Sequence, residues 1–109
     1  MHELSITQSL IDAVVDRIGE RKVLAVNVRV GPLSGVLPDA MRFCFDVASA
    51  GTPLDGAQLM IEEPRGLARC RNCHDEFELA DLILLCPCGS ADVEVLSGRE
   101  LMLMSVEVA

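Results

Sequence analysis

The sequence has few aromatic residues and little positive charge. Of its 109 residues, three are Phe and none is Trp or Tyr, so aliphatic side chains and Met must fill the core. Nine Lys and Arg residues stand against 17 Asp and Glu residues, which gives a formal net charge of −8. Nucleic acids and anionic membranes both bind basic surfaces, so this charge argues against either one as a partner.

Long hydrophobic runs are also missing. The longest one, residues 82–86, is far shorter than the ~20 apolar residues that a membrane-spanning helix needs. The first apolar segment, residues 4–18, is interrupted by polar and acidic side chains and does not resemble a signal peptide. We therefore expect a cytoplasmic protein, in which cysteines are more often thiols or metal ligands than disulfides.

The spacing of the apolar residues predicts two helices. In residues 4–18 these residues recur every three or four positions, and Gly19 is a suitable end. A second helix is predicted from Pro38 to Gly51, because proline is favoured in the first helical turn. The apolar faces of the two helices are Ile6, Leu10, Val14 and Ile18 in the first, and Met41, Phe45 and Ala48 in the second.

Three further segments are predicted to be strands. Residues 22–30 and 99–108 both alternate between two faces, as half-buried strands do. Another strand is predicted around Leu59 and Ile61, and Pro64 closes it. The residues expected to share one face are Leu24, Val26, Val28 and Val30 in the first strand, and Met102, Met104, Val106 and Val108 in the last.

The pattern changes between residues 65 and 97, where four of the five cysteines lie and the apolar periodicity fades. We predict an α+β fold in which two helices pack on a small three-stranded sheet. This α+β domain is predicted to be discontinuous and to comprise residues 1–64 and 98–109. Residues 65–97 are predicted to form a zinc-binding module inserted between two of its strands.

Two close cysteine pairs, C70-R-N-C73 and C86-P-C88, are separated by twelve residues. This arrangement is typical of a zinc-ribbon-like site with rubredoxin-type knuckles, in which four ligands surround Zn(II). The intervening residues are long enough for a hairpin that would bring the pairs together. The metal would supply the folding free energy that so small a module lacks. Cys44, the fifth cysteine, is expected to be a small buried apolar residue.

Two ligand sets fit this spacing: all four cysteines, or three cysteines with His74. His74 and Gly89 each follow a cysteine pair at the position where a metal knuckle adopts a positive φ. The second pair is one residue shorter than the usual C-x-x-C, and Pro87 has no N–H to donate. Haem attachment and a thioredoxin-like redox role fit less well, because neither an export signal nor a βαβ setting is visible.

The sequence begins with Met-His-Glu, which places three nitrogen donors close together. The Met1 amine, the His2 amide nitrogen and the His2 imidazole can close fused five- and six-membered chelate rings in one plane. Square-planar nitrogen ligands suit Ni(II) or Cu(II) better than zinc. A fourth position remains for Glu3 or for a ligand from a partner. A histidine at position 2 can equally be a chance occurrence, and the motif alone does not decide.

Together these motifs resemble the HypA/HybF family. The resemblance rests on MHELS, on G-x-L-S-x-V-x-P in residues 31–38, on R-F-x-F in residues 42–45, on the two cysteine pairs and on the closing S-V-E-V. It implies a nickel metallochaperone for [NiFe]-hydrogenase maturation, and in some bacteria for urease, that is not an enzyme. The implied partners are a nickel-inserting GTPase and the hydrogenase large-subunit precursor, with urease maturation proteins in some bacteria.

The resemblance also implies roles for single residues. His2 would be the nickel-binding residue, and Met1 and Glu3 would contribute main-chain nitrogens. C86-P-C88 departs from the C-P-x-C of the family and leaves the geometry of the second knuckle open. An alternative without nickel is a non-enzymatic zinc-ribbon adaptor that binds other proteins. The implied ligands of the structural zinc are Cys70, Cys73, Cys86 and Cys88.

Overall fold

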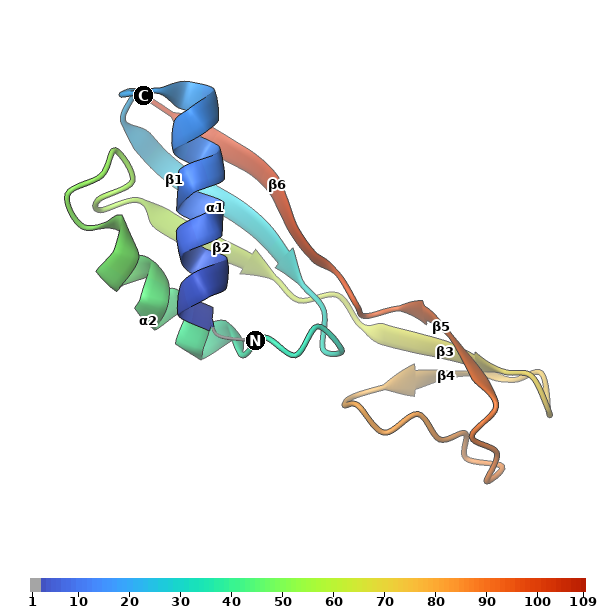
Figure 1. The fold of residues 1–109 in the computed structure, drawn as a ribbon. Helices are drawn as coiled ribbons and strands as arrows, with labels where there is room; N and C mark the ends of the chain where they lie inside the picture. The colour runs from blue at the N-terminus through green and yellow to red at the C-terminus, as the bar shows by residue number, and fades with distance from the viewer. Residues whose placement is uncertain (1–2) are drawn as a thin grey trace.

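A computed structural model describes residues 3–109 as two helices and six strands that form two separate sheets (Figure 1). The elements are α1 (Glu3–Ile18), β1 (Val23–Val30), α2 (Pro38–Ser49), β2 (Gln58–Glu62), β3 (Gly66–Cys70), β4 (Glu76–Leu79), β5 (Val93–Ser97) and β6 (Leu101–Val108). Neither helix in this part of the chain has the length and apolar character that a membrane crossing requires.

The first sheet has the strand order β2-β1-β6, with β1 parallel to β2 and antiparallel to β6. Helix α2 lies in the connection between the parallel strands, as a parallel pair requires. Both helices cover the same side of this sheet (Figure 1). Their apolar faces enclose the main core with the buried valines of β1, which confirms the predicted α+β arrangement. The core residues with the least exposure are Val14, Val23, Val26, Met41, Phe45 and Leu54.

A bulge in β1 contradicts the predicted alternation at its start. Val23 lies opposite Val108 and Ala25 lies opposite Glu107, so one extra residue is inserted between them. The insertion exchanges the two faces of the strand at that point. Val23 is consequently buried, whereas Leu24, predicted to share a face with the buried Val26, is 53% exposed.

A second irregularity in the same strand pair divides β6 into two halves. The register shifts between Asn27 and Val28, so Val106 lies opposite the buried Val26 whereas Met102 lies opposite Arg29. Residues directly opposite each other share a face, so Met102 and Val106 do not share the face that the simple alternation predicted. Residues 101–104 are between 37% and 46% exposed, and only the second half of β6 packs on the core.

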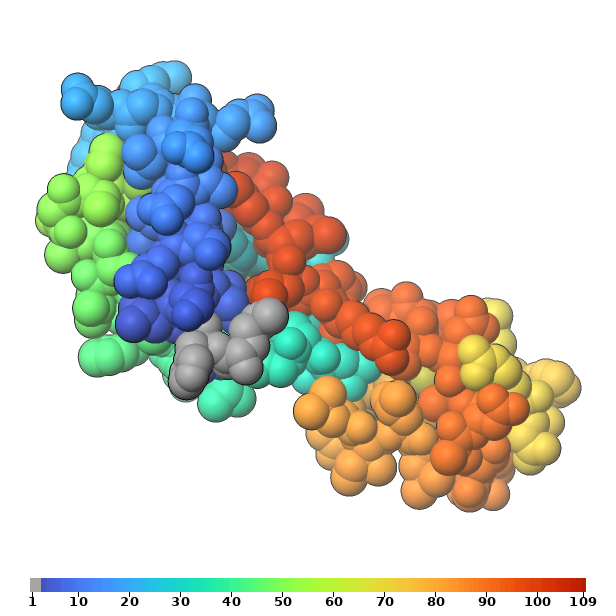
Figure 2. All heavy atoms as spheres, viewed as in Figure 1, coloured from blue at the N-terminus to red at the C-terminus, as the bar shows by residue number. Residues whose placement is uncertain are grey.

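The second sheet lies beside the first and extends the molecule to 53 × 21 × 18 Å (Figure 2). It has the order β4-β3-β5 with antiparallel pairs throughout. Its fully or almost fully buried side chains are few: Ala68, Cys70, Leu79 and Cys86. The twelve residues between the cysteine pairs, which are long enough for a hairpin, contain one strand, β4, and an irregular loop. Strand β4 pairs instead with β3, whose last residue is Cys70.

Candidate metal centre

Four cysteine sulfurs converge at one end of the second sheet. All four lie within 4.8 Å of one another. Two of the distances are short: 3.7 Å between Cys70 and Cys88, and 3.6 Å between Cys73 and Cys86. A tetrahedral zinc site with Zn–S bonds of ~2.3 Å needs sulfur–sulfur distances of ~3.8 Å. Two of the sulfur–sulfur distances therefore match a four-thiolate zinc site, and the upper limit of 4.8 Å keeps the whole cluster close to its dimensions.

The central strand β3 brings the two pairs together. Cys70 is its last residue, and the turn that contains Cys73 leads directly into β4. The other pair lies in the turn before β5, which is hydrogen-bonded to the opposite edge of β3. The arginine after Cys70 links the two turns, because its backbone N–H donates to the carbonyl of Asp92 and its side chain forms an ion pair with that residue.

Each pair forms a tight knuckle around its first sulfur. The N–H of Cys73 donates to the sulfur of Cys70, and the N–H of Cys88 donates to the sulfur of Cys86, both at 3.4 Å. The short second pair therefore still supplies one donor to its own sulfur, although Pro87 has none. The predicted positive φ is confirmed at both following residues, with 67° at His74 and 96° at Gly89.

These contacts make the four thiols unequal. Hydrogen bonding from the N–H of Cys73 lowers the pKa of Cys70 to about 6, because these N–H donors stabilise the thiolate. The N–H of Cys88 acts in the same direction on Cys86, but burial and three neighbouring thiols outweigh it and raise the pKa of Cys86 to about 12. A second thiolate beside the first is unfavourable without a cation. A divalent metal removes this conflict, because its charge stabilises all four thiolates together.

The cysteines differ in their exposure to solvent, and His74 does not belong to the cluster. Cys70 and Cys86 are buried, whereas Cys88 is exposed, so the cluster is open to solvent on one side. Among the described residues, the group able to hold a metal ion contains the four cysteines and does not include His74. Cys44 lies on α2 and is half-buried rather than fully buried as expected.

Of the three predicted nickel-binding residues, the structure describes Glu3. Met1 and His2 lie outside the described residues. Glu3 is the first residue of α1, and its carbonyl accepts a hydrogen bond of 2.6 Å from the hydroxyl of Thr7. Thr7 is completely buried, a polar residue on a face predicted to be apolar. Its hydroxyl bonds back to the carbonyl four residues earlier, so this buried polar group is satisfied within the helix. The sequence pattern contained no signal for this role.

Comparison with known families decides what these features belong to. The family model for HypA, described as hydrogenase/urease nickel incorporation, metallochaperone, matches residues 1–108. The chain belongs to the HypA family. It is accordingly a metallochaperone for hydrogenase or urease nickel incorporation, with a cysteine cluster that could bind a metal ion, and it is not an enzyme. The resemblance inferred from the sequence motifs is thereby confirmed.

Individual HypA proteins resemble the chain along its whole length. The hydrogenase maturation factor HypA of Geotalea uraniireducens is 49% identical over 109 residues, which cover 99% of both chains. The corresponding protein of Nostoc sp. is 44% identical over 108 residues, which cover 99% of this chain and 96% of the relative.

Two solution structures share the fold. The Ni metallochaperone HypA from Helicobacter pylori has a TM-score of 0.64 at 24% identity, covering 99% of this chain and 97% of that one. A second HypA protein has a TM-score of 0.66 at 25% identity, covering 100% and 97%.

Proposed function

We propose that this HypA protein binds Ni(II) at its N-terminus and delivers the ion for assembly of the [NiFe]-hydrogenase active site. The observation that carries the proposal is that the family match begins at residue 1 and so includes the Met-His-Glu start. A nickel-incorporation family needs a cargo site, and this motif offers a planar set of nitrogen donors. The four cysteines form a different kind of site, with the soft thiolate ligands and the dimensions that favour zinc.

In this proposal His2 supplies the essential imidazole. The Met1 amine and the His2 amide nitrogen lie in the same plane, so three of the donors come from two consecutive residues. The fourth position is taken either by the backbone nitrogen of Glu3 or by a ligand from a partner. An incomplete coordination sphere favours transfer, because the receiving protein can attach its own ligand before the first one is released.

The second metal in the proposal is a structural Zn(II). It holds the inserted module, residues 65–97, whereas residues 1–64 and 98–109 form the nickel-binding domain. Four thiolates within 4.8 Å support the all-cysteine set over the alternative with His74. The small number of buried side chains in the second sheet supports a structural role, because a module with so little core depends on its metal to fold. The proposed zinc ligands are Cys70, Cys73, Cys86 and Cys88.

The partners follow from the delivery of nickel to a hydrogenase. We propose that the protein acts in the cytoplasm with a nickel-inserting GTPase and docks on the hydrogenase large-subunit precursor. Urease maturation proteins are a further set of proposed partners, since the family description names hydrogenase and urease together. The strongly acidic composition is compatible with basic docking surfaces on these proteins and disfavours nucleic acid and membranes.

Titration of the untagged, zinc-loaded protein with Ni(II) in a calorimeter tests the nickel site. The wild-type protein is expected to bind one Ni(II) per chain. Two variants are expected to lose this binding: His2→Ala, which lacks the imidazole, and a protein with residues added before Met1, in which the amine becomes an amide. Zinc content serves as the control, and it should equal that of the wild type in both variants.

Equal nickel binding by all three proteins would contradict the proposed site. The better account would then be the non-enzymatic zinc-ribbon adaptor, in which the N-terminal histidine has no role. The adaptor hypothesis also predicts that His2→Ala leaves hydrogenase activity in cells unchanged. Loss of both nickel binding and hydrogenase activity in His2→Ala supports the metallochaperone mechanism instead.

Nickel affinity is expected to fall steeply below about pH 6.5. The imidazole and the terminal amine must each lose a proton before they bind the ion, and their ordinary pKa values are ~6.5 and ~8. Protons therefore compete with Ni(II) for the same nitrogens, and more of them bind as the pH falls. Repeating the titration from about pH 7.5 to about pH 5.5 measures the effect, and a constant affinity over this range would exclude the ligand set.

A further inference from the structure

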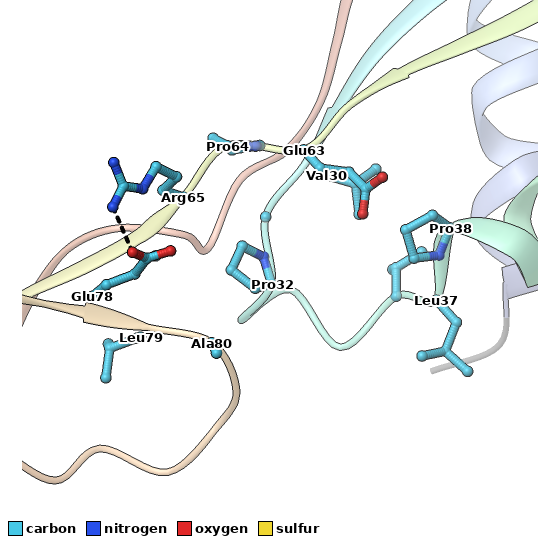
Figure 3. Close-up of a pocket in the computed structure, with 13 residues that line it drawn as sticks. Val30, Pro32, Leu37, Pro38, Glu63, Pro64, Arg65, Glu78, Leu79 and Ala80 are labelled. Carbon is cyan, nitrogen blue, oxygen red and sulfur yellow. Dashed lines mark hydrogen bonds and ion pairs between the residues drawn. The ribbon is translucent and has the colours of Figure 1, made fainter.

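The chain crosses twice between the two sheets, and a loop of the first domain lies against both crossings. One crossing is residues 63–65, between β2 and β3, and the other is residues 98–100, between β5 and β6. The loop, residues 31–37, connects β1 to α2 and contains most of the G-x-L-S-x-V-x-P motif. A pocket of about 390 Å³ lies between this loop, the first crossing and the end of β4, with Pro32 and Leu37 on one side and Leu79 and Ala80 on the other (Figure 3).

Hydrogen bonds join the loop to the second crossing. The N–H of Gly31 donates to the carbonyl of Glu100, and the N–H of Leu33 donates to the carbonyl of Gly98, both at 2.7 Å. The carboxylate of Glu100 accepts a further hydrogen bond of 2.6 Å from the N–H of Gly98. The first crossing is also tied to the end of β5, because the hydroxyl of Ser97 donates to the carbonyl of Arg65 at 2.9 Å.

Two glycines allow backbone segments to approach more closely than any side chain would permit. A Cβ atom on Gly31 would lie 2.0 Å from the carbonyl oxygen of Gly98, and one on Gly66 would lie 2.3 Å from that of Leu79. Neither glycine has a positive φ, so the backbone conformation does not explain them. What excludes a side chain at these positions is the space, and the atoms that would have to move belong to the backbone.

We propose that Gly31, Gly98 and Glu100 form a rigid junction that fixes the orientation of the zinc module on the nickel-binding domain, and that nickel delivery requires this orientation. The inference rests on the proposed function, because it assigns the zinc module a positional role in that delivery. It also gives a purpose to residues 31–38, which the ligand motifs leave without one. These three are positioning residues, since none is proposed to touch a metal.

The hydrogen bonds and close backbone contacts at the junction argue for a rigid connection, because a flexible one would not need them. A zinc module whose only task was to hold its own fold could be joined by two mobile linkers. Here three segments are instead packed and hydrogen-bonded together, and the loop continues directly into α2, which packs on α1. When two surfaces of one protein bind the same partner, a fixed spacing makes the second contact intramolecular and can raise the affinity ~100-fold or more. That gain is lost when the geometry is lost.

The test compares Gly31→Ala with Gly35→Ala in the full-length, zinc-loaded protein. Gly35 lies in the same loop, and a Cβ there meets nothing, but its φ of 81° makes the substitution strained. Gly35→Ala is therefore also expected to destabilise the loop, but it leaves the contacts of the junction intact. Residual dipolar couplings report the orientation: one alignment tensor should fit both sheets in the wild type and in Gly35→Ala, whereas Gly31→Ala should require two.

Function is tested by two measurements. The first is nickel binding by each purified variant, and the second is the hydrogenase activity of cells in which that variant replaces the wild-type protein. Gly31→Ala should keep the nickel stoichiometry and lose hydrogenase activity severalfold, and Gly35→Ala should keep both. A second pair guards against misfolding of Gly31→Ala. Glu100→Ala removes the acceptor for Gly98 and should behave like Gly31→Ala, whereas Glu100→Gln keeps an oxygen acceptor and should behave like the wild type.

A single tensor for both Gly31→Ala and Glu100→Ala would overturn the inference, and so would full hydrogenase activity in variants that need two tensors. Failure of the proposed function is distinguishable from either result. It would show as a wild-type protein that binds no Ni(II) at its N-terminus, while the dipolar couplings would still report whether the junction is rigid.

Discussion

Replacing Cys70 with serine is expected to release the zinc and to unfold the sheet β4-β3-β5, with the first sheet and its helices retained. Structural zinc sites contribute roughly 10–16 kcal/mol of binding free energy, and in small modules this is folding free energy. The Cys70 side chain is completely buried, and its sulfur accepts a hydrogen bond from the N–H of Cys73. The substitution therefore removes one of the four ligands and a contact that holds the first knuckle together. Zinc content per chain and backbone NMR signals from β3 to β5 measure the result.

Two substitutions control for this prediction. His74→Ala should leave one zinc per chain, because this residue is outside the sulfur cluster. Cys44→Ser should also leave the zinc in place, because Cys44 lies on α2 in the other part of the molecule. If His74→Ala lost the zinc and the serine variant of either Cys86 or Cys88 retained it, the set of three cysteines with His74 would be the correct one.

Replacing Phe45 with alanine is expected to lower the free energy of unfolding of the first domain by ~3–5 kcal/mol. Phe45 is 1% exposed and is the largest fully buried side chain in the chain described. Few other aromatic residues are available to fill the space, so the cavity would remain. Domains of this size have total stabilities of ~5–15 kcal/mol, and the loss would be a large fraction of that. Denaturation by urea, followed by circular dichroism of the helices, measures it.

Phe43 provides a matched control on the same helix. Its side chain is 70% exposed, so Phe43→Ala should change the free energy of unfolding by no more than ~0.5 kcal/mol. Both substitutions remove the same atoms and place the same residue in α2, and they differ only in burial. Similar losses for the two variants would show that the core does not lie where the structure places it.

Most of the first domain could be predicted from local pattern. A helix shows its buried face as a repeat of three or four residues, and the repeats in residues 4–18 and 38–51 correctly located α1 and α2. The three strands of the first sheet were also predicted from local pattern, chiefly the alternation of residues between two faces. The errors within them have one cause. A bulge inserts a residue into a strand pair, and it depends on the partner strand, so β1 and β6 alone could not reveal why Leu24 is exposed.

The cysteine cluster was also predictable, but its architecture was not. Two close cysteine pairs are themselves the signal, because few structures other than a metal site need that spacing. The three-stranded sheet that carries them has short strands and little apolar alternation, so its strand pairing could not be predicted from local pattern. Pairing of β3 with both neighbours decides the geometry, and pairing between distant segments leaves little trace in a short sequence.

The sequence by itself therefore determined the family, the α+β class, the two helices and the residues proposed to bind metal. Each of these depends on chemistry or periodicity that consecutive residues carry. Only the tertiary structure decided that the four sulfurs lie within 4.8 Å of one another, and that Gly31 lies against Gly98 at the junction of the two sheets. The physical reason is that a close approach involves residues far apart in the chain. A glycine in a loop looks the same whether it serves a turn or makes room for another segment.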